Sequence, residues 1–210
     1  MKNIKKLLEN FSEKDFEKDV DLHIHSNCSD GQMTPYEVIE CAKKKGLKYV
    51  SIADHNTLNA YLETNILKEN IVIPAIEFDC WYRGILIHIL GYGVDITNKE
   101  LQAICAKNKA QTEKDIVRFF TFRHPKTAIN AIKKAGGVAV LAHPACYWAI
   151  SLDHFIKCLM KLGIEGLEVF YPYKRHRGII KFHLLRNVKK IADKYNLIQT
   201  GGTDTHGKCL

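Results

Sequence analysis

The sequence lacks the features of disulfide-bonded, thiolate-metal and membrane-spanning proteins. Its seven cysteines are an odd number and no two form a C-x-x-C pair, which argues against a disulfide framework and against a zinc site built from thiolates. No stretch approaches the roughly 20 apolar residues that cross a bilayer, and no signal-peptide apolar block follows Met1. We therefore expect reduced cysteines and a cytoplasmic protein with no membrane partner.

Internal repeats, low-complexity tracts and coiled-coil heptads are also absent. Lysine and arginine outnumber aspartate and glutamate by 31 to 23, and the net charge of +8 could attract polyanions. No groove-binding motif and no regular interleaving of basic and aromatic residues accompanies this charge. For nucleic acid we therefore expect weak, salt-dependent association at most.

What the sequence does contain is a rhythm of strand-like and helical patterns. The 210 residues, 46% of them hydrophobic, can bury one sizeable core. Residues 1–19 predict one short amphipathic helix as an N-terminal extension, and residues 20–210 predict a single domain. Within it, strands are expected at 20–25, 49–53, 71–78, 85–91, 138–142, 167–170 and 197–200, and helices at 34–45, 127–134, 151–162 and 179–195. The charged segment 95–124 is expected to be a connecting helix, and the alternation as a whole predicts an α/β fold with a parallel sheet.

Side chains that bind metals well recur at the ends of these predicted strands. His23 and His25 lie two positions apart in an apolar run, so both side chains leave the same face of a strand. A single histidine is more often a hydrogen-bonded core or surface residue, and the repetition of the pattern is what predicts a metal cluster at one mouth of the fold. The candidate ligands are His23, His25, Asp30, His55, Glu77, His88, His143, Asp204 and His206.

Imidazole and carboxylate together suit Zn²⁺, Mn²⁺ or Fe²⁺ better than Ca²⁺ or Mg²⁺, which prefer oxygen ligands alone. Nine ligands exceed what one ion can use, so we expect two to three divalent ions with a carboxylate such as Glu77 between them. Such a cluster lowers the pKa of a bridging water enough to make hydroxide near neutral pH. This is the machinery of phosphoester hydrolysis, and no catalytic residue beyond the metal-activated hydroxide is predicted.

From about Val20 to Gly207 the sequence resembles the PHP (polymerase and histidinol phosphatase) domain family, in particular its stand-alone metal-dependent phosphoesterases. The motifs that carry the resemblance are DLHIHS at 21–26 with Asp30-Gly31, IADHNT at 52–57, PAIE at 74–77, IHILG at 87–91, AHP at 142–144 and GTDTHG at 202–207. The resemblance implies a distorted seven-stranded (β/α) barrel, similar to a TIM barrel. All nine ligand positions of the family are filled.

The resemblance also implies how the ligands are shared among ions. It assigns His23, His25, Glu77 and Asp204 to one ion, Glu77, His88 and His143 to a second, and Asp30, His55 and His206 to a third. Asp54, beside His55, would orient a ligand without binding metal itself, and a role as a helix or loop cap is an equal alternative.

The basic stretch after the sixth predicted strand is expected to supply positive groups that bind a substrate phosphate. Arg175 and His176 are the chosen candidates, with a solvated helix start as the alternative, and Arg83, Arg123 and His124 are further basic residues near strand-end loops. The family's nucleotide phosphoesterases commonly insert a helical domain between the His88 and His143 motifs. Residues 89–142 are too few for it, so a more open site is expected.

The function expected from the sequence is a metal-dependent phosphoesterase that hydrolyses a small phosphorylated substrate. A nucleotide, a nucleoside 3',5'-bisphosphate or the end of an oligonucleotide would each fit, and a short nucleic acid is thus a second class of partner. Two alternatives stay open, namely a histidinol-phosphate-type phosphatase and a non-catalytic regulatory module that binds metal. The oligomeric state is not predicted.

Overall fold

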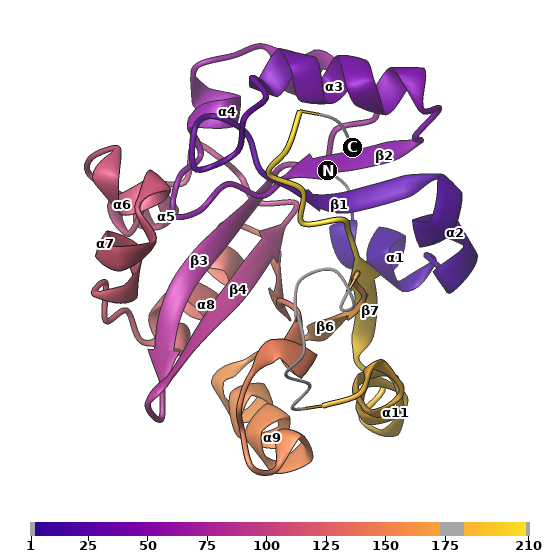
Figure 1. The fold of residues 1–210 in the computed structure, drawn as a ribbon, viewed down its shortest axis with the longest axis vertical. Coiled ribbons are helices and arrows are strands. Elements are labelled where there is room, and N and C mark those ends of the chain that lie inside the picture. Colours follow the sequence, from indigo (N-terminus) through magenta and orange to yellow (C-terminus); the bar gives the residue numbers. More distant parts are fainter. Residues whose placement is uncertain (1–2, 173–182, 209–210) are drawn as a thin grey trace.

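A computed structural model describes residues 3–172 and 183–208 as a mixed α/β fold with two sheets (Figure 1). In the smaller sheet, β1 (Val20–Ile24) pairs in parallel with β2 (Tyr49–Ile52). The larger sheet runs in chain order. Its strands are β3 (Ala75–Tyr82), β4 (Ile85–Tyr92), β5 (Val138–Leu141), β6 (Gly166–Phe170) and β7 (Ile198–Gly201). All seven predicted strands therefore have a counterpart.

Neither sheet is closed within the described residues, so the closed barrel implied by the resemblance is not observed. Isolated parallel bridges join the two sheets instead, between Val50 and Val72, between His55 and Glu77, and between Ile24 and Thr205. The strands thus follow one another from β1 to β7 and back toward β1, with the hydrogen-bonded ladder interrupted at two places. The metal-binding side chains lie beside these interruptions.

The sheet is also not parallel throughout, since β3 pairs antiparallel with β4, and β4 antiparallel with β5. Arg83 and Gly84 form the two-residue connection between β3 and β4, with φ of 53° and 76°. Positive φ at both central positions is typical of a type I′ hairpin turn, which joins antiparallel neighbours without a crossover helix. The predicted all-parallel arrangement is wrong here because a tight turn replaces the crossover.

The N-terminal extension contains two short helices rather than the predicted one, α1 (Ile4–Glu9) and α2 (Glu13–Lys18). Ser12 and Asp15 form a capping box that starts the second helix. Ile4 and Leu8 of α1 are buried in a small core that also receives side chains from β1, β3, β4, β5 and β7. The extension is therefore packed against the strands.

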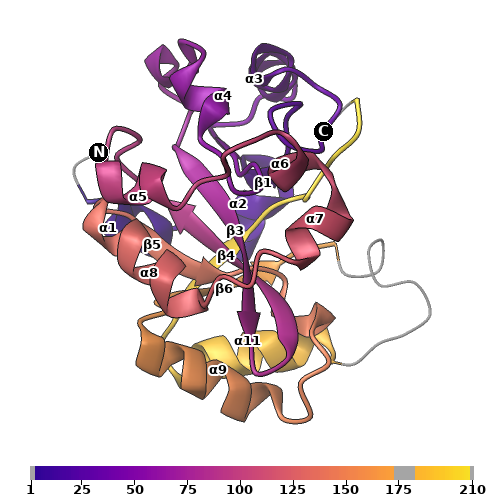
Figure 2. The same ribbon diagram turned by 90° about the vertical axis from the view of Figure 1, so that its left-hand side faces the viewer.

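The predicted helices at 34–45, 127–134 and 151–162 have counterparts, and the helix predicted at 179–195 is observed from Leu185, with residues 179–182 outside the described part of the chain. The predicted connecting helix over 95–124 is wrong. In its place are α5 (Lys99–Ala103), α6 (Ala110–Glu113) and α7 (Asp115–Phe119), which lie in front of the β3–β4 hairpin in Figure 2. The remaining helical elements are α3 (Pro35–Lys44), α4 (Asn59–Leu62), η1 (Ile66–Lys68), α8 (Pro125–Lys134), η2 (Pro144–Cys146), α9 (Leu152–Leu162) and α11 (Leu185–Lys194). The larger core packs α3, α8, α9 and α11 against the strands.

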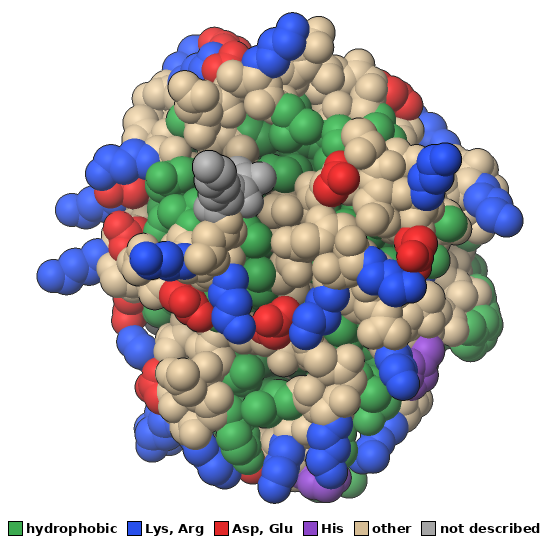
Figure 3. Space-filling view, turned by 180° about the vertical axis from the view of Figure 1, so that it is seen from behind, with side chains coloured by type: hydrophobic (Ala, Val, Ile, Leu, Met, Phe, Trp, Pro, Cys, Tyr) green, Lys and Arg blue, Asp and Glu red, His purple; other side chains and the backbone are tan. Residues whose placement is uncertain are grey.

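Two further expectations, weak association with nucleic acid and no membrane partner, concern the surface charge and the length of the helices. Lysine and arginine side chains are spread over the face seen in Figure 3, among fewer acidic ones. They do not gather into one basic groove on that face. In the described part of the chain, no helix combines the length and the apolarity needed to span a membrane.

Candidate metal centre

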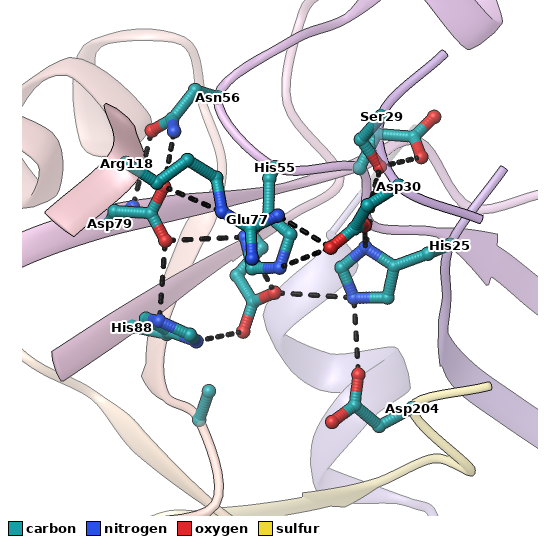
Figure 4. A network of polar contacts seen from close by, with 12 residues as sticks. His25, Ser29, Asp30, His55, Asn56, Glu77, Asp79, His88, Arg118 and Asp204 are labelled. Atoms are coloured by element: carbon teal, nitrogen blue, oxygen red, sulfur yellow. Dashed lines mark hydrogen bonds and ion pairs between the residues drawn. The ribbon is translucent and has the colours of Figure 1, made fainter. Parts of the chain in front are cut away.

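All nine predicted ligands lie together where the strand ends meet (Figure 4 labels six of them). His23 belongs to β1 and His25 follows it, while Glu77 lies within β3 and His88 within β4. The other five follow β1, β2, β5 and β7 in loops. His23, His25 and Glu77 are almost completely buried, whereas His206 is partly exposed at the edge of the cluster. We call these nine side chains the ligand cluster.

One part of the cluster has the spacing of a four-coordinate metal site. The Nε2 atoms of His23 and His25 are 3.2 Å apart, and Asp204 Oδ1 lies 3.4 Å and 3.1 Å from them. Glu77 Oε2 lies 3.3 Å from each of the same two nitrogen atoms. Ligand atoms about 2.0–2.1 Å from a tetrahedral ion are about 3.3 Å from one another. His23, His25 and Asp204 could therefore hold one ion together, and Glu77 Oε2 lies close to both histidines of this group.

Glu77 faces two groups of histidines with its two carboxylate oxygens. Oε2 faces His23 and His25, while Oε1 lies 3.1 Å from His88 Nδ1 and 3.4 Å from His143 Nε2. A carboxylate whose oxygens point to separate imidazole groups can hold two ions a few ångströms apart. The sharing of Glu77 between ions stays a prediction, for which this arrangement supplies the geometry.

Asp30 gathers a third part of the cluster. Its Oδ1 lies 3.3 Å from His206 Nε2 and 3.5 Å from His25 Nδ1, and its Oδ2 lies 3.8 Å from His55 Nε2. The rings of His25 and His206 are stacked with centroids 4.1 Å apart. His25 therefore touches two parts of the cluster, one with each ring nitrogen.

Two residues that the sequence analysis missed hold ligands in place. Glu168 of β6 accepts from the backbone N–H of His143 at 2.8 Å, and its other oxygen lies 2.8 Å from His23 Nδ1. Tyr171 donates its hydroxyl proton to Asp204 Oδ2 at 2.7 Å. A carboxylate on the far nitrogen of a ligating imidazole fixes the tautomer and the ring orientation. The one signal for Glu168 was an acid inside the apolar run 166–170.

A third missed residue, Asp79, adds a further group of possible ligands. Its Oδ1 lies 3.3 Å from His55 Nδ1 and 3.2 Å from His88 Nε2, and these three side chains could hold an ion together. Its Oδ2 receives a short hydrogen bond from Asn56 Nδ2. Arg118 of α7 lies beside it and bonds Asp30 Oδ2 at 2.6 Å. The local signal for Asp79 was its position two residues after Glu77, on the same face of β3.

Asp54 contacts the loop between β1 and Asp30. It accepts from the backbone N–H of Ser26 at 2.7 Å and from the hydroxyls of Ser26 and Ser29, each at 2.6 Å. Ser29 Oγ is in turn 3.5 Å from His25 Nδ1. These side-chain contacts correspond to the loop-cap alternative, and the backbone oxygen of Asp54 also accepts from the N–H of Glu77 at 3.2 Å.

The predicted phosphate-binding residues Arg175 and His176 lie outside the described residues. Of the other basic candidates, Arg123 bonds Asn56 Oδ1 at 2.6 Å and the backbone oxygen of Asp79 at 2.9 Å, so it supports the β3 side of the cluster. Arg83 is exposed at the hairpin turn and His124 caps α8. Arg118 is the buried cation that touches the predicted ligand Asp30.

Histidines and carboxylates in the cluster shift one another's pKa. Burial alone lowers the pKa of His25, but the carboxylates of Asp204 and Glu77 outweigh it and raise the pKa to about 10. Burial alone raises the pKa of Glu77, but the charges of His23 and His55 hold it well below 4.5. His25 and Glu77 are therefore charged in opposite senses, and a metal ion would have to displace a proton from His25.

Among the described residues, two buried atoms of the site lack the hydrogen bonds that a site without metal would need, and this favours metal binding. His55 Nδ1 and Asp79 Oδ1 are buried, lie 3.3 Å apart and form no hydrogen bond in the described part of the chain. Buried polar atoms are nearly always hydrogen-bonded, so such a pair calls for a missing partner. Two ligands, His143 and Asp204, have positive φ of 27° and 49°. Strain of this kind is typical of functional sites.

Taken together, a mixed α/β fold with clustered histidines and carboxylates at its strand ends is that of a metal-binding protein of the hydrolase type. The PHP domain family model matches residues 21–165, and the chain belongs to this family.

Two relatives and one solved structure illustrate the likeness. A phosphoribosyl 1,2-cyclic phosphate 1,2-diphosphodiesterase of Eggerthella lenta is 25% identical over 90% of this chain and 94% of its own length. A 3',5'-nucleoside bisphosphate phosphatase of Chromobacterium violaceum is 28% identical over 69% of this chain, which spans half of that protein. A structure from Bifidobacterium adolescentis, described as a metal-dependent phosphoesterase, superposes with a TM-score of 0.72 at 22% identity, covering 91% of this chain and 88% of that one.

Proposed function

We propose that this chain is a metal-dependent phosphoesterase that hydrolyses small phosphorylated substrates. The observation that carries the proposal is the position of Glu77, whose two oxygens face separate histidine groups. A site that shares one carboxylate between ions is suited to phosphoester hydrolysis. Residues 20–210 would form the catalytic domain, with residues 1–19 as its helical extension.

The ligand assignment follows the family pattern and is supported by the distances above. One ion would be held by His23, His25, Glu77 and Asp204, a second by Glu77, His88 and His143, and a third by Asp30, His55 and His206. The imidazole and carboxylate donors favour Zn²⁺, Mn²⁺ or Fe²⁺. Asp79 adds a carboxylate between the second and third sets of ligands.

When bound, divalent ions supply a low pKa to coordinated water and accept charge from phosphate oxygens. The chain's own residues prepare the site for them. Glu168 orients His23 through its Nδ1, leaving Nε2 for the metal, and Tyr171 orients the carboxylate of Asp204. Arg118 places positive charge beside Asp30 at the edge of the cluster. Arg175 and His176 remain the proposed phosphate-binding pair.

The alternative of a regulatory module without turnover would be favoured by lost ligands. All nine are present and lie together, which favours catalysis. Among substrates, nucleotides, nucleoside 3',5'-bisphosphates and oligonucleotide ends are proposed because relatives are named for nucleotide and RNA substrates.

The first test is the variant His25→Ala. His25 touches Asp204, Glu77 and Asp30, so its removal should lower the metal content and reduce turnover by at least roughly a hundredfold, the effect of about 3 kcal/mol of lost transition-state stabilisation. Metal analysis and phosphate release from an aryl phosphate and a panel of nucleotides are the measurements.

The matched control is His154→Ala, which removes an exposed histidine of α9. It should keep both the metal content and the turnover of the wild type. Wild-type turnover in His25→Ala would refute the cluster as the active site. A wild-type protein that holds fewer than two ions and cleaves neither monoesters nor diesters with Mn²⁺ or Zn²⁺ would refute the enzymatic function.

A second prediction concerns Asp79→Asn. The change keeps the size of the side chain but removes a charge that lies within 3.3 Å of both His55 and His88. We expect metal affinity to fall about 10- to 100-fold, as for other residues that support ligating histidines. Competition with a chelator measures this affinity without reference to turnover. Asp95→Asn, at an exposed position, should leave it unchanged, and an equal fall in both variants would contradict a specific role for Asp79.

A further inference from the structure

Four aromatic side chains form an exposed surface next to the ligand cluster. Trp81 lies near the end of β3, and Phe119, Phe120 and Phe122 lie at the end of α7 and just after it. Trp81 contacts Phe119 edge-on at 4.8 Å between centroids and lies 6.0 Å from Phe122 with nearly parallel planes. The three phenylalanines are exposed, Phe122 by 66%. We call these four residues the aromatic patch.

The strand β3 connects the aromatic patch to the ligand cluster. Side chains alternate along a strand, so Glu77, Asp79 and Trp81 lie on one face, while Phe78 and Cys80 point into the larger core. Two residues along a strand span about 6.6 Å. The indole of Trp81 is therefore the next side chain on this face after Asp79.

The helix α7 makes a second connection. Arg118 reaches Asp30 and Asp79, and the next residue, Phe119, begins the aromatic patch. The backbone oxygen of Phe119 accepts from Trp81 Nε1 at 2.6 Å, which ties α7 to β3. In Figure 1 α7 lies beside the β3–β4 hairpin. The aromatic patch is thus connected to the ligand cluster by β3 and by Arg118 of α7.

The charges around the patch indicate what could cover it. Between residues 114 and 126 the sequence has four basic residues, Lys114, Arg118, Arg123 and Lys126, and a single acid, Asp115. Arg118 is buried in ion pairs with Asp30 and Asp115, whereas Arg83 is exposed at the nearby turn. Lys114 and Lys126 are exposed as well. Flat apolar rings among positive charges suit a ligand that has both planar rings and negative charge. An apolar protein surface would satisfy the rings only.

We propose that the aromatic patch stacks the base of a nucleotide whose phosphate lies at the ligand cluster. The substrate class would then be a nucleotide or the end of a single strand, rather than a phosphorylated sugar without a base. This inference rests on the proposed phosphoesterase function. Stacking of a base on an aromatic side chain contributes roughly 1–3 kcal/mol, so losing it should cost about 5- to 150-fold in affinity.

Binding can be measured separately from turnover by tryptophan fluorescence, because Trp81 is one of only two tryptophans in the sequence. In the variant Trp148→Phe, a phosphorothioate oligothymidylate should quench the remaining fluorescence, that of Trp81. An abasic strand with the same number of phosphates should quench it far less. Equal quenching by both strands would overturn the stacking proposal and point to electrostatic contact only. Quenching by neither strand would overturn it as well, because no ligand would then reach Trp81.

Turnover supplies the second measurement. In the double variant Phe120→Ala/Phe122→Ala we expect the ratio of kcat/KM for a nucleoside 3',5'-bisphosphate to that for ribose 5-phosphate to fall about tenfold. Tyr36→Ala removes an exposed aromatic residue of α3, away from α7, and should keep the ratio. The double variant Phe120→Tyr/Phe122→Tyr, which retains the rings, should keep the wild-type ratio.

The outcomes separate this inference from the function it rests on. A wild-type protein that releases phosphate from no substrate contradicts the phosphoesterase, whereas the fluorescence titration still decides the stacking. An unchanged ratio in the double variant, with wild-type turnover present, contradicts the patch alone. A wild-type dimer that the double variant converts to a monomer would assign the patch to a second copy of the chain, which would also overturn the proposal.

Discussion

The variant Glu77→Gln should lose metal-dependent turnover by about a thousandfold and hold at least one ion fewer than the wild type. Glutamine has the size of glutamate, but one of its two oxygens becomes an amide nitrogen that cannot bind a metal. Because Oε1 and Oε2 of Glu77 face different histidine groups, either orientation of the amide removes a ligand from one of them. A thousandfold change corresponds to about 4 kcal/mol, within the several kcal/mol that metal ions supply to such reactions.

A second measurement on this variant is independent of activity. In chelated wild-type protein the carboxylate of Glu77 compensates protonated histidines, and its pKa is held well below 4.5. A lowered carboxyl pKa stabilises the fold above the unfolded-state value of about 4.3. His25, with its pKa raised to about 10, contributes its stability below its unfolded-state value of about 6.5 and loses it as the pH rises through 10. Chelated Glu77→Gln should therefore unfold at lower urea concentration than the wild type near pH 5.5.

That difference in the unfolding midpoint should shrink as the pH falls below about 4, because the unfolded chain then takes up a proton at Glu77 while the folded protein keeps this carboxylate ionised. Glu100→Gln is the matched control, since Glu100 is exposed, lies away from the ligand cluster in sequence and forms an ion pair with Lys134 on the surface. It should keep the metal content, the turnover and the unfolding midpoint. Full metal content together with full turnover in Glu77→Gln would exclude a shared role for this carboxylate.

The candidate ligands could be recognised in the sequence because each lies within an apolar run or after one. His23 and His25 show the principle, since alternation along β1 puts both on one side with no need to know the rest of the fold. The supporting residues could not be found in this way. Glu168 lies inside a strand 145 residues from His23, and its place in an apolar run does not reveal which residue it contacts. Its partner is set by the order of the strands.

The predicted connecting helix over 95–124 also shows a limit of local patterns, because its division into short helices brings Arg118 to the cluster. Residues 95–124 have a helical, charged pattern, yet they fold as three short helices whose last one places Arg118 against Asp30. Periodicity describes one face of one helix and gives no information on where a chain turns back. The hairpin between β3 and β4 was similarly missed, although Arg83-Gly84 between two apolar runs is a local turn signal. Both errors concern segments that connect strands. Both segments, the β3–β4 hairpin and α7, border Asp79, the residue that the sequence analysis missed.

The variant Gly202→Ala should disrupt both the fold and the metal site, because β7 leads into the last ligands past the backbone of His23. A Cβ at position 202 would lie 2.4 Å from His23 N and 2.8 Å from its Cα. Backbone cannot move aside as a flexible side chain can, and His23 is held from both sides by buried hydrogen bonds to Asp204 and Glu168. We expect a loss of roughly 3 kcal/mol in the free energy of unfolding, at the upper end for overpacked sites, together with loss of the ion that Asp204 would share with His23.

Gly207→Ala separates this effect from a general intolerance of the C-terminal segment. An added Cβ there has only Thr205 Oγ1 within 4 Å, at 3.9 Å, so the unfolding free energy should stay within about 0.5 kcal/mol of the wild type. Urea unfolding and metal analysis of both variants are the measurements. If Gly202→Ala kept the wild-type midpoint and metal content, the close approach of residue 202 to His23 would not be what positions Asp204. The reason lies in the geometry of the segment: Asp204 donates its backbone N–H to His23 O at 2.7 Å, so the ligand reaches its position only while these two backbones remain in contact.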